Sequence, residues 1–473
     1  MSLPSMFKPS RTSHWLTPLA AVAAFALAMP AFAQTETGAA AAWRATSRLG
    51  YGPTSETARA AQSDARAWAL QQLDAAYAAS QRTPAIPADL AAFNAPLNEL
   101  ASDFHAEREA RRLARNTPAG PAAKEFSRDM QQSAAAWRLM ACSDPALEPP
   151  LLARMTEFWF NHLNVFVGKG TVRPFVGHYT VNVIRANALG KFEDMLLASA
   201  RHPAMLYYLD QAQSNARGLN ENYARELMEL HTLGVNAGYT QNDVRELARI
   251  LTGWTVALPQ GEAFRFADRL HDKGDKVLLG RSFTADGQRE GEEAIRMLAR
   301  HPATAQRIAQ RLAATFVADQ PSKALTDKLA ATFTRTQGDM RAVMRTLIES
   351  PDFWRADNTL FKTPMDFACS ALAAGDGVKD RQGIQQTLGF LAQAGQPMHG
   401  WQTPDGYKTD AATWLAPEAL TRRADFAMTL GGRMAEPLYL QPFLSPASRE
   451  RIAREAPATR AGLTLASPDF MAK

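Results

Sequence analysis

The chain has 473 residues, of which 46% are hydrophobic, and its 52 basic and 47 acidic residues give a formal net charge of +5. This length is sufficient for a large hydrophobic core in one or two domains. The charge is too small to indicate a nucleic-acid-binding protein, which usually has a clustered basic face. We therefore expect no nucleic-acid partner.

Residues 1–33 have the three parts of a cleavable secretory signal peptide. Lys8 and Arg11 charge the start, a short apolar run covers 19–29, and Ala31-Phe32-Ala33 supplies the small residues of a cleavage site. The run is shorter than the roughly 20 apolar residues that span a membrane. We predict cleavage near Ala33, a periplasmic or secreted location, and no membrane span afterwards. Residue 34 is Gln rather than Cys, so no lipid anchor is expected there.

After the leader, apolar residues recur at intervals of three and four, which predicts helices along most of the chain. Helix-start signals support this. Ser350-Pro351-Asp352-Phe353 and Ser467-Pro468-Asp469-Phe470 each place a serine N-cap before a proline at the first helical position.

Two segments rich in Pro, Ala and Asn, 81–97 and 116–123, predict loops. They divide an N-terminal helical region, residues 34–148, from a main helical core, residues 149–473.

A short interruption of the helical pattern lies further along the chain. Phe264-Arg265-Phe266 and Val277 to Gly280 flank a polar stretch, which predicts a small β-hairpin near residues 264–280. The expected fold class is all-α, a multi-helix globular bundle with this one small β-hairpin.

The helix predicted over 151–166 is apolar nearly all round, so we expect it to be largely buried. Its polar residues of interest are Arg154, Glu157, Asn161 and His162, the first three on one stripe. Buried charges must be paired. One interpretation of Glu157 is an internal Arg–Glu bridge that connects helices. The alternative places Glu157 against Arg225 or Glu226 at the floor of a pocket, with a raised pKa suited to acid–base chemistry.

Residues 219–254 predict two capped amphipathic helices around a turn. On the first, an apolar arc comprises Leu219, Tyr223, Ala224, Leu227, Met228 and Leu230. The polar candidates on and beside this helix are Asn220, Asn222, Arg225, Glu226 and Glu229. His231 falls within the apolar arc, about 140° from Glu226. A metal site from this one helix is therefore excluded, and we favour a hydrogen-bonded core histidine over a ligand or base.

The second helix has a clearer start and end. Thr240 and Asp243 form a capping-box-like pair, and Gly253 is suited to the C-terminal cap. Further on, the His271-Asp272 pair has two interpretations: functional residues on a loop, or an aspartate that stabilises its own turn.

The only cysteines are Cys142 and Cys369. In an oxidising compartment they could form a disulfide, and they could equally be buried thiols. No CxxC spacing, HExxH motif or zinc-type Cys/His set occurs, so no metal site is predicted. No phosphate-binding loop, dinucleotide fingerprint or nucleophile elbow occurs either, so the cofactor, if any, is not indicated.

Several segments together resemble a bacterial family called domain of unknown function 1800. The segments are Arg48–Thr54, Glu157–His162, Asn220–Gly234, Tyr239–Trp254, His271-Asp272, Ser350–Phe353, Pro404–Tyr407 and Trp414-Leu415. The resemblance implies an exported protein without an established activity, so no catalytic residues carry over. It also implies a possible partner, an exported protein of sulfatase- or phosphatase-like character encoded nearby.

Two functions remain open. The first is a periplasmic helical scaffold or partner-binding protein, with binding candidates Arg154, Asn161, His162, Asn220, Asn222, Arg225 and His271. The alternative is a secreted hydrolase or lyase that uses a buried cluster, with catalytic candidates Glu157, Glu226, Glu229, His231 and Asp272.

Overall fold

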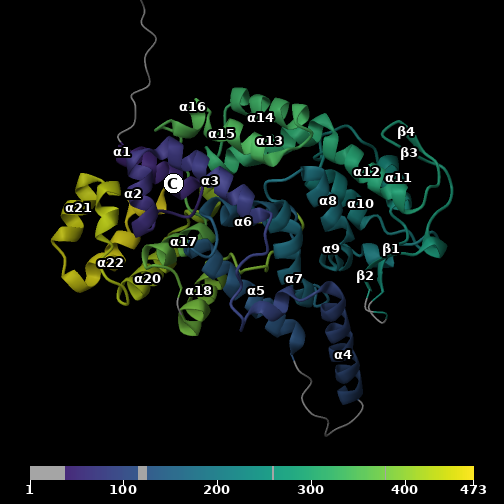
Figure 1. Cartoon of the computed structure of the whole chain (residues 1–473), viewed down its shortest axis with the longest axis horizontal. Coiled ribbons are helices and arrows are strands. Elements are labelled where there is room, and N and C mark those ends of the chain that lie inside the picture. Colours follow the sequence, from purple (N-terminus) through teal and green to yellow (C-terminus); the bar gives the residue numbers. More distant parts are fainter. Residues whose placement is uncertain (1–37, 116–124, 258–259, 261, 379) are drawn as a thin grey trace, which may run out of the picture. The chain divides into compact units, whose positions relative to one another are not determined.

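The computed structural model describes residues 38–473 except 116–124, 258–259, 261 and 379. The predicted signal peptide and the predicted loop at 116–123 lie outside the described residues. In the first half of the chain the helices are α1 Gly38–Arg48, α2 Ser55–Ser63, α3 Ala65–Ser80, α4 Leu97–Arg115, α5 Phe126–Ser143, α6 Pro150–His162, α7 Val176–His178, α8 Phe192–Arg201, α9 Pro203–Tyr208, α10 Asn222–Glu226 and α11 Gln241–Ile250 (Figure 1).

The second half continues the same helical pattern. Its helices are α12 Gln288–Arg300, α13 Pro302–Phe316, α14 Lys323–Arg335, α15 Met340–Ile348, α16 Pro351–Trp354, α17 Pro364–Ala374, α18 Arg381–Gln393, α19 Ala411–Trp414, α20 Pro417–Gly431, α21 Pro446–Ala453, α22 Pro457–Leu465 and α23 Pro468–Met471. Two π-helices, η3 Tyr179–Arg185 and η5 Leu227–His231, and short 3-10 turns complete the helical elements. The all-α fold class is confirmed.

The predicted serine caps are present where the sequence placed them. The Ser350 side chain accepts from the backbone N–H of Phe353, and that of Ser467 accepts from Phe470. Thr240 and Asp243 form the reciprocal capping box that begins α11. These helix starts are local signals, so they hold irrespective of what the helices pack against.

Two clusters of buried apolar side chains form the core. The larger includes Trp137 of α5 and Trp159 of α6, and the smaller is built around Phe367 of α17. Leu139 of α5 and Ala153 of α6 belong to the smaller cluster, so both of these helices contribute to both clusters. The described residues belong to one compact unit, and those before residue 149 pack within it.

Helix α6 is buried on most sides, as its aromatic residues predict. The Phe158 ring lies 6.2 Å from that of Phe316 on α13, and the Trp159 ring stacks on Phe192 of α8 at 5.4 Å. Phe160 packs on the ring of His399 at 5.1 Å. Because three neighbouring side chains contact three different segments, a polar residue on α6 lies inside the protein unless a cavity reaches it.

The β-structure lies where it was expected, but its strands pair differently. Strand β2, Glu262–Phe266, pairs with the preceding β1, Trp254–Ala257, and β3, Lys276–Leu278, pairs with the following β4, Arg281–Phe283. The two segments predicted to form one hairpin therefore belong to two separate hairpins. Strands of three to five residues carry too little periodicity to select a partner.

The block at 222–231 begins as an α-helix and continues as a π-helix, η5. Tyr223, Leu227 and Met228 are buried as the apolar arc predicts, while Leu219 and Leu230 are only partly buried. The helix also begins at Asn222 rather than at residue 219. Apolar spacing at the α-helical period does not distinguish a short π turn from an α turn, so the sequence predicts only a helix here.

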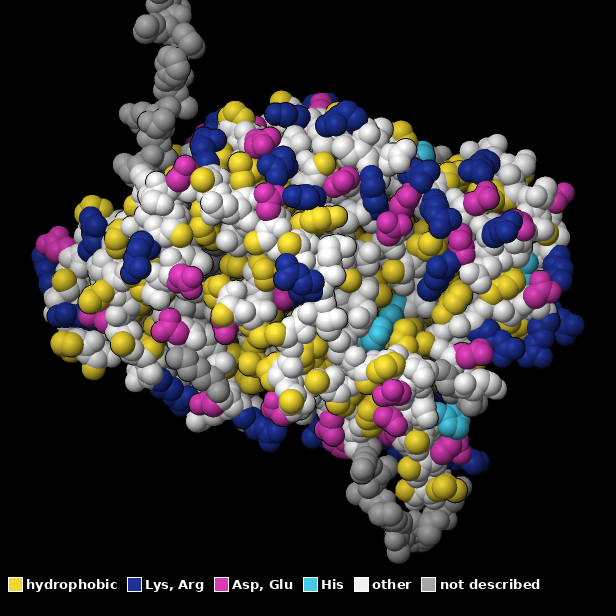
Figure 2. Space-filling model, in the orientation of Figure 1, with side chains coloured by type: hydrophobic (Ala, Val, Ile, Leu, Met, Phe, Trp, Pro, Cys, Tyr) yellow, Lys and Arg dark blue, Asp and Glu magenta, His cyan; other side chains and the backbone are white. Residues whose placement is uncertain are grey.

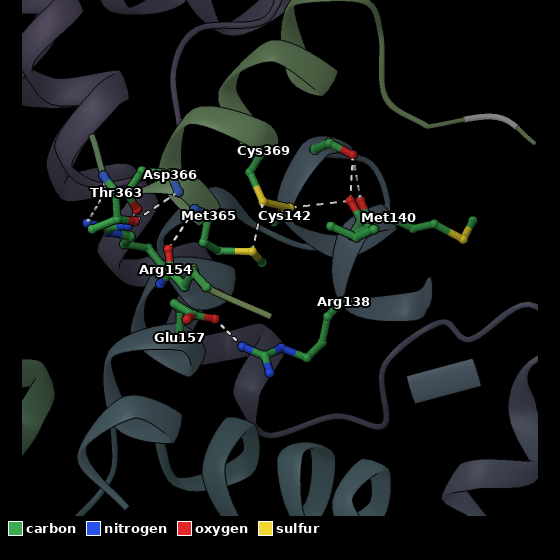
Figure 3. The surroundings of a disulfide bond; sticks show 12 residues. Arg138, Met140, Cys142, Arg154, Glu157, Thr363, Met365, Asp366 and Cys369 are labelled. Carbon is green, nitrogen blue, oxygen red and sulfur yellow. Dashed lines mark hydrogen bonds and ion pairs between the residues drawn. A yellow bond between two sulfur atoms is a disulfide. The ribbon is translucent and has the colours of Figure 1, made fainter. Parts of the chain in front are cut away.

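A disulfide joins Cys142 at the end of α5 to Cys369 on α17, with a Cα–Cα distance of 5.6 Å (Figure 3). The bond connects positions 227 residues apart in the chain. Of the two alternatives left open by the sequence, the structure contains the disulfide.

No helix within the described ranges has both the length and the apolar character needed to cross a membrane. On the face drawn in Figure 2, cationic and anionic side chains are interspersed over much of the surface.

Candidate ligand-binding site

A cavity of about 360 Å³ opens beside α6. Its walls come from one face of α6, the C-terminal half of α13 with the turn that follows it, the start of α17, and the loop between α18 and α19. The residues that line the cavity include Arg154, Glu157, Phe158, Asn161, Arg311, Asp319, Asp366, Asp405, Tyr407, Lys408 and Asp410. The three residues of the predicted polar stripe, Arg154, Glu157 and Asn161, all lie on this wall.

Arg154 forms a buried ion pair with Asp366 at the first turn of α17 (Figure 3). Both side chains are at most 5% exposed, and Lys473 binds the second carboxylate oxygen of Asp366. Burial by itself would raise the pKa of Asp366, but the charges and hydrogen bonds of Arg154 and Lys473 outweigh it and lower the pKa. Asp366 is therefore a permanent anion between two cations.

The sequence around Asp366 contains a helix-start signal. Thr363 is the N-cap of α17 and Asp366 occupies its third position, so the two residues form a capping box. That motif predicts the helix start. It does not predict the ion pair with Arg154, because the partner lies 212 residues away in the chain.

Glu157 pairs with Arg138 of α5 rather than with the later helix (Figure 3). The Arg138 guanidinium also lies over the Phe160 ring, 4.6 Å from its centroid. Arg225, the partner considered in the alternative interpretation, instead binds Glu221 at 3.1 Å. The internal Arg–Glu bridge is thus the arrangement found for Glu157, and it connects α6 to α5.

Asn161 fastens the loop at 396–410 to α6. Its Nδ2 donates to the backbone oxygen of Tyr407 at 2.8 Å, and its Oδ1 accepts from the Tyr407 N–H at 2.6 Å. Gly406 makes this approach possible: its φ is +74°, and a Cβ there would lie 2.0 Å from the Asn161 backbone oxygen. The loop is therefore a fixed wall of the cavity, and residue 406 must be glycine.

Arg311 of α13 was not singled out by the sequence. Its side chain is partly buried on the cavity wall. Burial and the charge of nearby Arg307 lower the pKa of Arg311 to about 10, against the opposing effect of Asp405. Arg307 donates to the Leu230 backbone oxygen at 3.1 Å. Two arginines four residues apart on one helix were a signal for a positive patch, but nothing in the sequence placed that patch beside α6.

Glu226 and Glu229 lie on the helix that follows residue 220 and do not line the cavity. Glu229 lies 3.9 Å from Arg225. The Glu226 carboxylate is partly buried and has no hydrogen-bond or ion-pair partner within the described residues. Burial raises the pKa of Glu226, the charges of Glu229 and Asp405 raise it further, and Arg225 opposes them.

His231 is buried in the core, 1% exposed, as its place in the apolar arc predicts. Its ring does not match the expected hydrogen-bonded histidine, because Nε2 has no partner among the residues described. Burial and the charges of Arg307 and Arg311 lower the pKa of His231 to about 3, so its ring is neutral at physiological pH. His162 Nε2 donates to the His231 backbone oxygen at 3.0 Å, which is the one direct bond found between these two candidates.

The remaining candidates lie elsewhere and form local bonds. Asn220 Oδ1 accepts from the Asn222 N–H at 2.9 Å, and Asn222 donates to the backbone oxygen of residue 209 at 3.3 Å. The Asp272 carboxylate binds Arg249 at 2.8 and 3.1 Å and accepts from the Gly274 N–H at 2.9 Å. Asp272 therefore stabilises its own turn, one of the two interpretations considered for it.

His271 is buried in a separate ionic cluster. Its Nε2 contacts the Glu290 carboxylate, which also binds Lys276 at 2.8 Å. His271 Nδ1 is 2.8 Å from the Thr252 backbone oxygen, to which it donates. The hydrogen bond of Arg249 is the main cause that lowers the pKa of Asp272, so this carboxylate stays ionised. The His271-Asp272 pair thus connects the β3 region to α11 and α12.

Within the described ranges, no group of three or more His, Cys, Asp or Glu side chains could hold a metal ion. The fold and the site define an all-α protein in which one polar cavity is built on the buried helix α6. The chain belongs to the family described as "Protein of unknown function (DUF1800)", whose profile matches residues 44–472, nearly the whole chain. Comparison with curated proteins and with solved structures finds no match to either.

Proposed function

We propose that this chain is an exported helical scaffold that binds a small polar molecule in the cavity beside α6. The observation that carries the proposal is that bonds within the protein fix α6, the start of α17 and the loop at 396–410 before any ligand arrives. Arg154 is held by Asp366, Glu157 by Arg138, and the loop at 396–410 by Asn161. The volume of about 360 Å³ is within the range typical of small-molecule sites.

Export is supported by two independent features. The N-terminal 33 residues have the composition of a cleavable signal peptide. A disulfide, here between Cys142 and Cys369, persists mainly in oxidising compartments such as the periplasm. Fractionation of the producing cells should find the protein in the periplasm, with Gln34 as the first residue by intact mass. A cytoplasmic protein that retains residues 1–33 would contradict this part of the proposal.

A binding role fits the site better than catalysis, because two of the candidate carboxylates are already neutralised. Arg138 binds Glu157 and Arg249 binds Asp272. A general base needs a carboxylate that can reach and release the substrate proton. Rigid, paired side chains are instead suited to holding a ligand in one orientation.

The test is native mass spectrometry on protein purified from periplasm, with one variant that fills the cavity. Ala314 is partly buried on the wall, so Ala314→Trp occupies part of the space. Ala331 is exposed on α14, and Ala331→Trp is the matched control. We expect a small-molecule adduct in the wild type and in the control and none in Ala314→Trp. The absence of any adduct from the wild type, or its equal presence in all three, would contradict the proposal.

One observation favours a second candidate function, a hydrolase or lyase. Glu226 has a raised pKa, and it immediately precedes the π-helix η5, a type of segment that often occurs at functional sites. A protonated carboxyl of this kind is suited to general acid catalysis. Glu226→Gln should then abolish turnover of an ester, phosphoester and glycoside substrate panel while the melting temperature stays the same or rises. The alternative fails if the wild type turns over no member of the panel.

A further inference from the structure

We infer that the molecule bound in this cavity carries an anionic group, a carboxylate, phosphate or sulfate, and that Arg311 is the residue that binds it. The inference rests on the proposed function, namely that the cavity binds a ligand, and it adds the chemical class of that ligand.

Arg311 differs from the other arginine of the wall. Arg154 is neutralised by Asp366, whereas the Arg311 guanidinium has no hydrogen-bond or ion-pair partner in the part of the chain that the structure describes. A guanidinium has five N–H donors in a planar fork. Leaving them unpaired in a partly buried position is unfavourable, and a bidentate anion satisfies two of them at once.

No carboxylate of the wall forms a hydrogen bond or ion pair with Arg311 within the described residues, and each is bonded elsewhere. Asp319 accepts from the Ala411 N–H at 2.9 Å. Asp405 accepts from Trp401 Nε1 at 2.9 Å and from a threonine hydroxyl at 2.5 Å. Asp410 caps α19, and its Oδ1 accepts from the backbone N–H at residue 413 at 3.0 Å. Glu157 and Asp366 are paired with other cations, and Asp405, whose charge raises the pKa of Arg311, forms no ion pair with it in the part of the chain that the structure describes.

Two further cations, Arg307 and Lys408, also favour the binding of an anion near Arg311. Arg307, four residues before Arg311 on α13, lowers the pKa of Arg311 by like-charge repulsion. Lys408 lies on the cavity wall with its side chain exposed, and its amine has no partner within the described residues. An anion in the cavity would relieve the repulsion between the two arginines and gain attraction from the lysine.

The remaining wall favours an organic anion over a bare inorganic ion. The side chains of Phe158 and Tyr407 line the same cavity, and they give the ligand body an apolar and aromatic surface. The ligand class is therefore a small organic acid or phosphate ester, with its charged group at Arg311.

The experiment measures binding of sodium phosphate and sodium acetate to the mature protein by isothermal titration calorimetry, with glucose as a neutral probe, at constant ionic strength. Arg311→Gln removes the fork and Arg311→Lys keeps only the charge. Arg296→Gln is the control, since Arg296 is partly exposed, lies outside the cavity wall and pairs with Glu292 on α12. We expect the control to bind an anion as the wild type does and Arg311→Gln to bind about tenfold more weakly or worse, the loss typical of a charge-assisted hydrogen bond. Arg311→Lys should be intermediate.

The results separate failure of this inference from failure of the proposed function. Binding of glucose but of neither anion would overturn the anionic ligand and leave the cavity as a binding site. Anion binding that is unchanged in Arg311→Gln would overturn the role of Arg311. Both proposals fail if no probe binds and if native mass spectrometry finds the same adducts on Ala314→Trp as on the wild type. Should Arg311→Gln not fold, Arg311→Lys carries the comparison alone.

Discussion

Removing the disulfide should destabilise the protein mainly through the unfolded state. The bond closes a loop between positions 227 residues apart. In the chain-entropy treatment, a loop of this length restricts the unfolded chain by about 5 kcal/mol, while native disulfides more often contribute about 2–4 kcal/mol. We therefore expect the double substitution Cys142→Ala and Cys369→Ala to lower the free energy of unfolding by about 2–5 kcal/mol.

Urea denaturation followed by circular dichroism measures this change. The same samples with and without dithiothreitol provide the control, because a reductant acts only on a protein that has the bond. Reduction of the unfolded wild type should therefore lower its midpoint towards that of the double variant, and the double variant should not respond. A change below about 1 kcal/mol, or an equal effect of dithiothreitol on both proteins, would refute the reasoning.

Three further predictions concern the cavity and its surroundings. Asp366→Asn leaves buried cations without their anion and should lower the free energy of unfolding, measured by urea denaturation, by about 3–5 kcal/mol. Asp327→Asn at an exposed site is the control and should have little effect. Equal effects of the two substitutions would contradict the buried ion pair. Gly406→Ala should displace the loop and abolish the ligand adduct in native mass spectrometry, and Gly170→Ala, where an added Cβ has nothing within 4 Å, should not. Glu226→Gln should raise the melting temperature at neutral pH, because the raised pKa means that ionised Glu226 opposes folding. That gain should vanish below the ordinary pKa of 4.5 and grow as the pH rises to the folded pKa, and a gain independent of pH would argue against it.

The features that the sequence could predict are those determined by residues close together in the chain. Thr240 and Asp243 cap a helix because they lie three positions apart, and the capping box is present. Arg154, Glu157 and Asn161 share a helix face for the same reason, and all three line the cavity. Local spacing determines which face a side chain occupies, so predictions of this kind hold without knowledge of the fold.

The partners of those residues could not be predicted in the same way. Arg154 binds Asp366, and Asn161 binds the backbone of Tyr407, over separations of 212 and 246 residues. Nothing in the spacing of a helix specifies which distant segment packs against it. Arg311 was missed for this reason too, since its helix is recognisable but its place beside α6 is a property of the tertiary packing.

The bonds between Asn161 and residue 407 use only the backbone of the loop. The side chains at positions 408 and 409 form no hydrogen bond or ion pair within the described residues, so they contribute little to holding this wall in place. Substitutions at these positions could change the charge or size of the ligand that the cavity accepts without moving the loop that forms the wall. Related chains could in this way acquire different ligands while they keep one unchanged framework, provided that Asn161 and Gly406 are retained.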